Sequence, residues 1–238
     1  MRAIARMVLG TALSLCFSFV ATAQTSEVPT PPVTTSSPEV SFKFDRVGLP
    51  VPQFTLRIHE NGVGTYQADQ AEIPATPTAM RGQAAQHVDR PINLTSGTVA
   101  KIFKDARELN RFNVECASKA KNIADTGTKT LTYAGSDGSG SCVYNYSENK
   151  TVQSLTDIFL GIVSTLDEGR KLEFLHRYDR LGLDAEINSF ADEVKEGHAI
   201  ELGTISPTLA AVADDTAVIQ RVRLKAAKML ELAAEGSH

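Results

Sequence analysis

The sequence QFTLRIHENGVGTYQA, residues 53–68, decides the fold. Apolar and polar residues alternate over residues 53–60, which is the pattern of a strand with one buried face. Residues 61–62 (NG) favour a two-residue hairpin turn, and alternation resumes over residues 63–68. Residues 40–45 (VSFKFD) show the same alternation upstream. The sequence therefore predicts a three-stranded antiparallel meander.

A loop, a helix and a second hairpin are expected next. Residues 69–94 are rich in Pro, Ala and Gln, and we interpret them as a long loop with one short strand near His87. Ser96 is expected to cap a helix with an apolar face. That face comprises Val99, Ile102, Phe103, Ala106 and Leu109. Residues 128–134 and 141–146 alternate as strands on either side of the turn sequence GSDGSG.

From Thr151 onward the apolar residues recur at helical spacing, and we expect four helices. The boundary signals are Gly182 after the first helix, Asp184 and Gly197 around the second, Ser206 and Pro207 before the third, and Asp215 before the fourth. The predicted fold class is α+β. An antiparallel meander, a helix and a hairpin occupy residues 40–150, and an all-helical region follows over residues 151–238.

The first 23 residues have the composition of an export signal. Arg2 and Arg6 supply positive charge, residues 7–20 are apolar, and Ala23 ends a small-x-small cleavage site. This apolar run is shorter than the about 20 residues that span a bilayer, although an uncleaved anchor is the alternative. We expect cleavage after Ala23 and a periplasmic or secreted chain with no stable membrane insertion. A Pro-, Ser- and Thr-rich disordered tether would follow over residues 24–39.

Charge and cysteine content restrict the partners and the compartment. Cleavage removes Arg2 and Arg6 from the 24 basic residues and leaves all 28 acidic ones, so the mature net charge is −6. This balance does not favour nucleic acid as a partner. Cys116 and Cys142 remain after cleavage. In an oxidising compartment we expect them to form a disulfide, with two separately buried thiols as the alternative. No cofactor is expected.

The first folded part resembles a family of exported bacterial domains of unknown function. The family pattern is an apolar strand, then Y/F-x-L-x-I-x-x-x-G-x-x-x-Y, a helix and a second hairpin. Its matches here are Phe54, Leu56, Ile58, Gly62 and Tyr66, with the helix after Thr95 and strands around Leu131 and Val143. Family members often carry a cysteine-containing turn where this chain has residues 48–52 (GLPVP), so the role of that cysteine is not carried over. The resemblance implies a fold and no activity.

The C-terminal residues 205–232 resemble a HEAT-type helical repeat. The matching positions are Pro207, Asp214, Asp215, Val222, Ala226 and Leu230. Solenoids need about three repeats to build a continuous core. A plain helical cap packed on the sheet is therefore the alternative interpretation.

One short motif points to catalysis. Asp125, Thr126 and Gly127 are similar to the Asp-Thr-Gly signature of aspartic peptidases, in which two such aspartates share a proton. The chain holds one copy of this motif. The alternative interpretation of residues 125–127 is a turn that leads into the strand at Thr128.

Metal and partner sites have weaker signals. Histidines 59, 87, 176 and 198 lack metal-ligand spacing, and a site assembled in space from His87 and Asp89 is the remaining metal hypothesis. Acidic and basic residues cluster over residues 157–184, and two interpretations are open: a recognition face for a protein partner, or a solvated helix surface.

These observations predict a non-catalytic interaction or structural module of the cell envelope with an unknown envelope protein as partner. We assign no catalytic and no metal-ligating residue, and we do not expect an enzyme. The alternatives are an aspartic-type peptidase that uses Asp125 and a protein that binds a small ligand or metal between sheet and helices.

Overall fold

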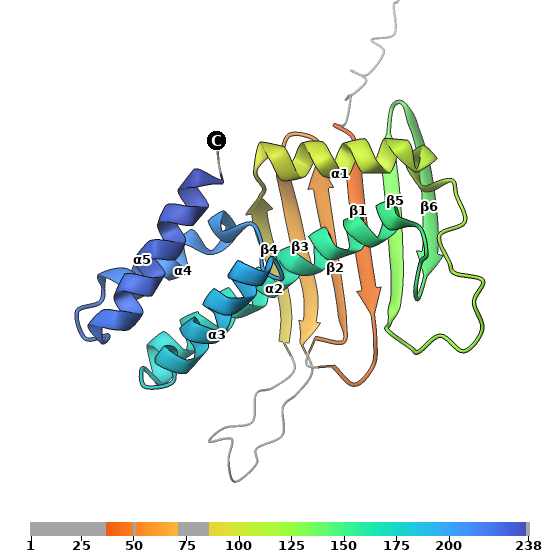
Figure 1. The fold of residues 1–238 in the computed structure, drawn as a ribbon. Coiled ribbons are helices and arrows are strands. Elements are labelled where there is room, and N and C mark those ends of the chain that lie inside the picture. The colour runs from red at the N-terminus through yellow and green to blue at the C-terminus, as the bar shows by residue number, and fades with distance from the viewer. Residues whose placement is uncertain (1–36, 50, 71–85, 237–238) are drawn as a thin grey trace, which may run out of the picture. The chain divides into compact units, whose positions relative to one another are not determined.

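A single antiparallel sheet is the framework of the computed structural model, which describes residues 37–49, 51–70 and 86–236. In that part of the chain the strand order is β4-β3-β2-β1-β5-β6 (Figure 1). The strands are β1 (Glu39–Asp45), β2 (Gln53–His59), β3 (Val63–Gln70), β4 (Gln86–Asn93), β5 (Thr128–Gly135) and β6 (Gly138–Tyr144). The predicted meander is confirmed, and the short strand expected near His87 is β4, which extends the meander at its edge.

The alternation of side chains defines one buried and one open face of the sheet. Val40, Phe42 and Phe44 of β1 are buried, whereas Lys43 between them is exposed. Gly62 has a φ of +88° in the β2–β3 turn, a left-handed conformation that glycine adopts without strain. The alternating pattern and the turn therefore specify both the strand register and the face of the sheet that carries the core.

The helices are α1 (Ser96–Glu108), α2 (Lys150–Tyr178), α3 (Leu183–Glu196), α4 (Ser206–Asp214) and α5 (Gln220–Glu235), with 3-10 helices η1 (Asn110–Phe112) and η2 (Leu202–Ile205). Helices α1 and α2 lie on the same face of the sheet (Figure 1). The Phe42 and Phe159 rings stack with centroids 5.0 Å apart, and Phe103 meets Tyr133 edge-on at 6.2 Å. These contacts join strand and helix residues in one apolar core, and the α+β prediction is confirmed.

Helix α2 extends past the β4 edge of the sheet, and its second half packs with α3, η2 and α4 (Figure 1). The segment before η2 is tied back to the start of α1. Thr95 donates its backbone N–H to Glu201 Oε2 at 2.9 Å and its hydroxyl to Oε1 at 2.6 Å. Glu201 itself has a left-handed φ of 61°. The helices after residue 182 are thus attached to both α2 and the edge of the sheet.

Several predicted boundaries are wrong by a few residues, each for a local reason. Thr95, rather than Ser96, caps α1 with its side chain. Asp215 does not start the last helix, because its Oδ1 accepts the N–H of Ala217 in a turn and α5 begins at Gln220. The second hairpin has a shorter turn than GSDGSG, since β6 begins at Gly138. Gly197 ends α3, as predicted, and the structure gives it a left-handed φ.

The expected export signal, residues 1–23, and most of the expected tether, residues 24–39, lie outside the described residues. The described chain belongs to one compact unit, Thr35–His238, and the division at residue 150 stays a prediction. Among the described residues, the helices are too short or too polar to cross a membrane.

Candidate functional site

Asp125 lies in a tight turn. Its Oδ1 accepts the backbone N–H of Gly127 at 2.9 Å, and its side chain is exposed. The neighbouring Lys129 is only 6% exposed, and its ammonium donates to the carbonyls of Thr126, Gly127 and Asn145 at 2.9 to 3.1 Å. Burial lowers the pKa of Lys129. This arrangement supports the interpretation of the Asp-Thr-Gly sequence as a turn. The buried Lys129 stabilises the turn by donating hydrogen bonds to its carbonyls.

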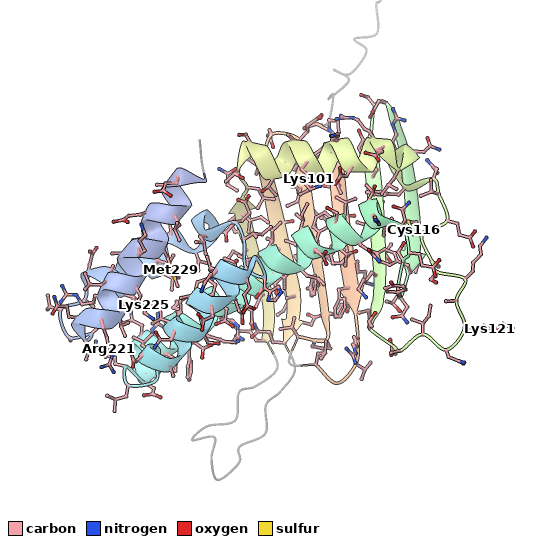
Figure 2. The ribbon with its side chains drawn as sticks, in the orientation of Figure 1. Lys101, Cys116, Lys121, Arg221, Lys225 and Met229 are labelled. Atoms are coloured by element: carbon pink, nitrogen blue, oxygen red, sulfur yellow. A yellow bond between two sulfur atoms is a disulfide. The ribbon has the colours of Figure 1, made fainter. Side chains whose placement is uncertain are left out.

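The disulfide between Cys116 and Cys142 is confirmed, with Cα atoms 5.8 Å apart and both residues buried (Figure 2). It attaches the segment after η1 to the edge strand β6. Asn113 adds a hydrogen bond from its amide to the Ser139 carbonyl at 2.8 Å. The disulfide therefore holds this segment against the edge strand β6, which is a structural role.

The histidines named in the sequence are separated from one another and each contacts a carboxylate. The pairs are His59–Glu39 at 3.7 Å, His87–Asp69 at 2.7 Å, His176–Asp215 at 2.8 Å and His198–Glu196 at 3.3 Å. Asp89 accepts a hydrogen bond from Gln67 rather than joining His87. Within the described ranges, no three His, Cys, Asp or Glu residues come together as a metal site.

Many charged side chains of residues 157–184 pair with other residues of the same chain. Asp184 receives two hydrogen bonds of 2.7 Å from Arg221 of α5, and Lys171 lies 3.7 Å from Glu186 of α3. Lys225 contacts Asn188 beside the first of these pairs, on the side of α5 that faces α3 (Figure 2). The charges therefore attach helices to one another, which disfavours a recognition face along this whole stretch.

Among the acidic residues that the structure describes, Glu168 combines a buried side chain with a raised pKa. Its side chain is 6% exposed, and its Oε2 is buried without a hydrogen-bond partner. Burial raises the pKa of Glu168 to about 7, although the adjacent Lys171 opposes this shift and the Glu186 carboxylate adds to it. The group lies on α2 facing α3 and does not line the cleft described below.

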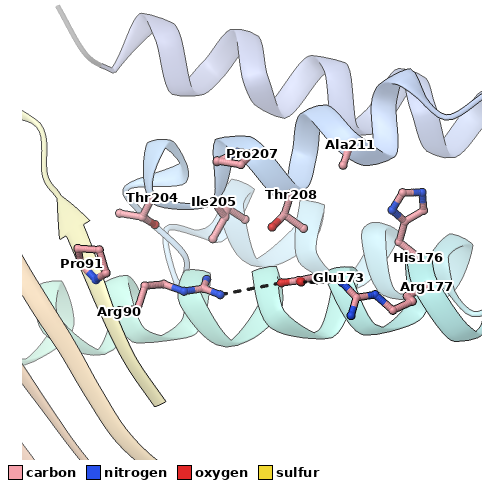
Figure 3. Close-up of a pocket in the computed structure, with 10 residues that line it drawn as sticks. All are labelled: Arg90, Pro91, Glu173, His176, Arg177, Thr204, Ile205, Pro207, Thr208 and Ala211. Carbon is pink, nitrogen blue, oxygen red and sulfur yellow. Dashed lines mark hydrogen bonds and ion pairs between the residues drawn. The ribbon is translucent and has the colours of Figure 1, made fainter.

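A cleft of about 510 Å³ opens where the edge of the sheet meets the helices (Figure 3). We call it the junction cleft. Its lining comprises Arg90 and Pro91 of β4, Glu173, His176 and Arg177 of α2, and Thr204, Ile205, Pro207, Thr208 and Ala211 of η2 and α4. Three elements that are far apart in the sequence thus contribute to one concave surface, as ligand sites commonly require.

Packing against α2 positions the wall formed by η2. A Cβ on Gly169 would lie 2.4 Å from Ile205 Cγ2, so only glycine at this position lets η2 approach the helix closely. Gly161 has a weaker effect of the same kind, since a Cβ there would lie 3.2 Å from Ile200 Cγ1. Two glycines eight residues apart on a helix were the one sequence signal for this close approach, and the sequence prediction did not use it.

Glu173 lies between two arginines in the junction cleft (Figure 3). Its Oε2 is 3.9 Å from Arg90 Nη2, and its Oε1 is 3.5 Å from Arg177 Nη2. His176 is engaged on the other side, where its Nε2 is 2.8 Å from Asp215 Oδ2. The cleft therefore holds two arginines against one loosely placed acid.

In comparisons with known proteins, no family model matches this chain. A search of curated proteins also finds no match. The resemblances to the exported domain family and to HEAT repeats therefore stay predictions.

Proposed function

We propose that the mature chain is a non-catalytic interaction protein of the cell envelope and that the junction cleft is its binding site. The proposal assigns no cofactor, metal or nucleic-acid partner to it. The observation that carries the proposal is the composition of the cleft. Arg90 and Arg177 face a concave surface with loose internal pairing, whereas the other motifs of the sequence take part in turns, helix contacts and a disulfide.

The proposed location outside the cytosol is supported by two features. Residues 1–23 have the composition of an export signal. The Cys116–Cys142 disulfide belongs to the oxidising compartments in which exported proteins work. The partner is an envelope protein that inserts a terminal or protruding group into the cleft.

Site-specific photo-crosslinking tests the proposal. A photoreactive side chain at Thr208 lines the cleft, and one at Thr130 lies on the open face of the sheet and serves as the matched control. We expect a discrete adduct with an envelope protein from position 208 and none from position 130. No adduct from position 208, or the same adduct from both positions, would refute the cleft as the binding site.

The peptidase alternative is tested separately. The purified protein should leave casein intact between about pH 3 and pH 7. Cleavage that disappears in Asp125→Asn would overturn the non-catalytic assignment in favour of an aspartic-type peptidase.

A further inference from the structure

We infer that the junction cleft binds a carboxylate group attached to a small apolar residue, with Arg90 and Arg177 as the receiving groups and Glu173 as their internal competitor. The inference rests on the proposed function and deepens it by naming the chemistry of the bound group.

The arginines of the cleft are held more loosely than Arg107 and Arg221. Arg221 makes two hydrogen bonds of 2.7 Å to Asp184, and Arg107 lies 2.7 Å from Glu60. These are the short distances of strong charge-assisted pairs. Arg90 and Arg177 lie 3.9 Å and 3.5 Å from Glu173. Since each guanidinium carries five N–H donors, most donors of both arginines remain for an incoming anion.

The charge balance of the cleft favours a monoanion. Two arginines face one glutamate, and His176 is paired with Asp215 outside this group. The local excess is thus about one positive charge, in a chain whose net charge is −4. A carboxylate matches that excess and the planar fork of a guanidinium. A phosphate dianion would bring a second negative charge close to Glu173.

The remaining walls are suited to a short apolar group. Pro91, Ile205, Pro207 and Ala211 present carbon atoms to the cleft, and Thr204 and Thr208 place hydroxyl-bearing side chains among them. The volume of about 510 Å³ lies in the range of sites for small molecules or a few residues of peptide. The required chemistry is a free carboxylate next to an apolar side chain, which both a peptide C-terminus and a free N-acylated amino acid provide.

Calorimetric titration of the full mature chain tests the inference. The probes are acetyl-Ala-Ala-Leu with a free carboxylate, the same peptide as its amide, and N-acetyl-leucine. We expect the free acid to bind at least tenfold more tightly than the amide, because charge-assisted hydrogen bonds to the carboxylate are lost in the amide. Binding of the tripeptide acid alone indicates a chain terminus as the source, and equal binding of N-acetyl-leucine indicates a free organic acid.

Four variants locate the bound group. Arg90→Gln and Arg177→Gln should each weaken binding of the acid at least tenfold, and Glu173→Gln should strengthen it severalfold by removing the competitor. Arg57→Gln is the matched control, because this arginine is exposed on the open face of the sheet and should leave the affinity unchanged. Circular dichroism and thermal unfolding identify any variant that fails to fold, and the remaining arginine variant then decides.

Three results would overturn the inference: no binding of either acid at millimolar concentration, equal binding of acid and amide, or unchanged affinity in both arginine variants. If position 208 still crosslinks to an envelope protein, the inference fails while the proposed function stands. If neither test gives binding, both fail.

Discussion

Replacing Glu168 by glutamine should remove a pH dependence of stability that the wild-type chain carries. The Glu168 carboxyl is buried on α2, and its pKa is raised to about 7 from an ordinary value of 4.5. A carboxylic acid with a raised pKa in the folded state binds its proton more tightly there than in the unfolded chain. Its contribution to stability is therefore complete below about pH 4.5 and is lost as the pH rises through about 7.

The magnitude follows from the two pKa values. Each pKa unit corresponds to about 1.4 kcal/mol. Linkage over this pair of values lowers the free energy of unfolding by about 2.5 kcal/mol between pH 5 and pH 8. Glutamine has the shape of the protonated acid and does not titrate. Relative to wild type, Glu168→Gln should therefore gain about 2.5 kcal/mol across this range.

Urea denaturation at half-unit steps from pH 5 to pH 8 measures the difference. Glu231→Gln, which changes an exposed glutamate on α5, is the control and should leave the wild-type pH profile unchanged. If the profiles of wild type and Glu168→Gln run parallel, with a constant offset at every pH, the assignment of the raised pKa to Glu168 is wrong. A carbon-13 titration of the Glu168 carboxyl gives the same test without unfolding.

Three further predictions concern the framework of the fold. Replacing Cys116 and Cys142 by serine should lower the free energy of unfolding by about 3 kcal/mol in urea, since the bridge closes a 26-residue separation; free thiols in the native protein would contradict the bridge. Lys129→Met should cost about 1 to 3 kcal/mol in the same assay, because it leaves one buried and two partly buried carbonyls without their ammonium donor. An unchanged midpoint would refute this role of the ammonium. Gly169→Ala should lower the free energy of unfolding by about 1 to 3 kcal/mol, because the added methyl group overpacks against η2. Gly97→Ala in α1 is the control, since its methyl group meets open space and should stabilise the protein by about 0.5 kcal/mol. Equal thermal shifts for the two variants would contradict this packing.

Sheet, turn and helix signals are local, which is why they could be predicted. Alternation in residues 40–68 reports which side of each strand faces the core, and Asn61 with Gly62 determines the turn that pairs two of the strands. Helix boundaries were less accurate because several neighbouring residues can cap the same turn. Thr95 and Ser96 are both acceptable caps, and the hydrogen bonds of Thr95 to Glu201 favour the first.

The candidate site could not be predicted in the same way. Arg90 follows a stretch with weak periodicity, and Glu173 and Arg177 look like ordinary surface residues of a helix. They meet because α2 is longer than the sheet is wide and because η2 returns to it across Gly169. Apart from the two glycines of α2, nothing in the local pattern of any one element specifies that contact.

The sequence by itself determined the α+β class, the strands joined by the Asn61–Gly62 turn and which two cysteines of the mature chain could bond, since each depends on periodicity, turn chemistry or residue count. The tertiary structure alone decided that Asp125 belongs to a turn, that the charged residues of α2 are paired within the helix or with neighbouring elements, and that two arginines share a cleft. The physical reason is that charge pairing and burial depend on distances between residues far apart in the chain, which only packing sets.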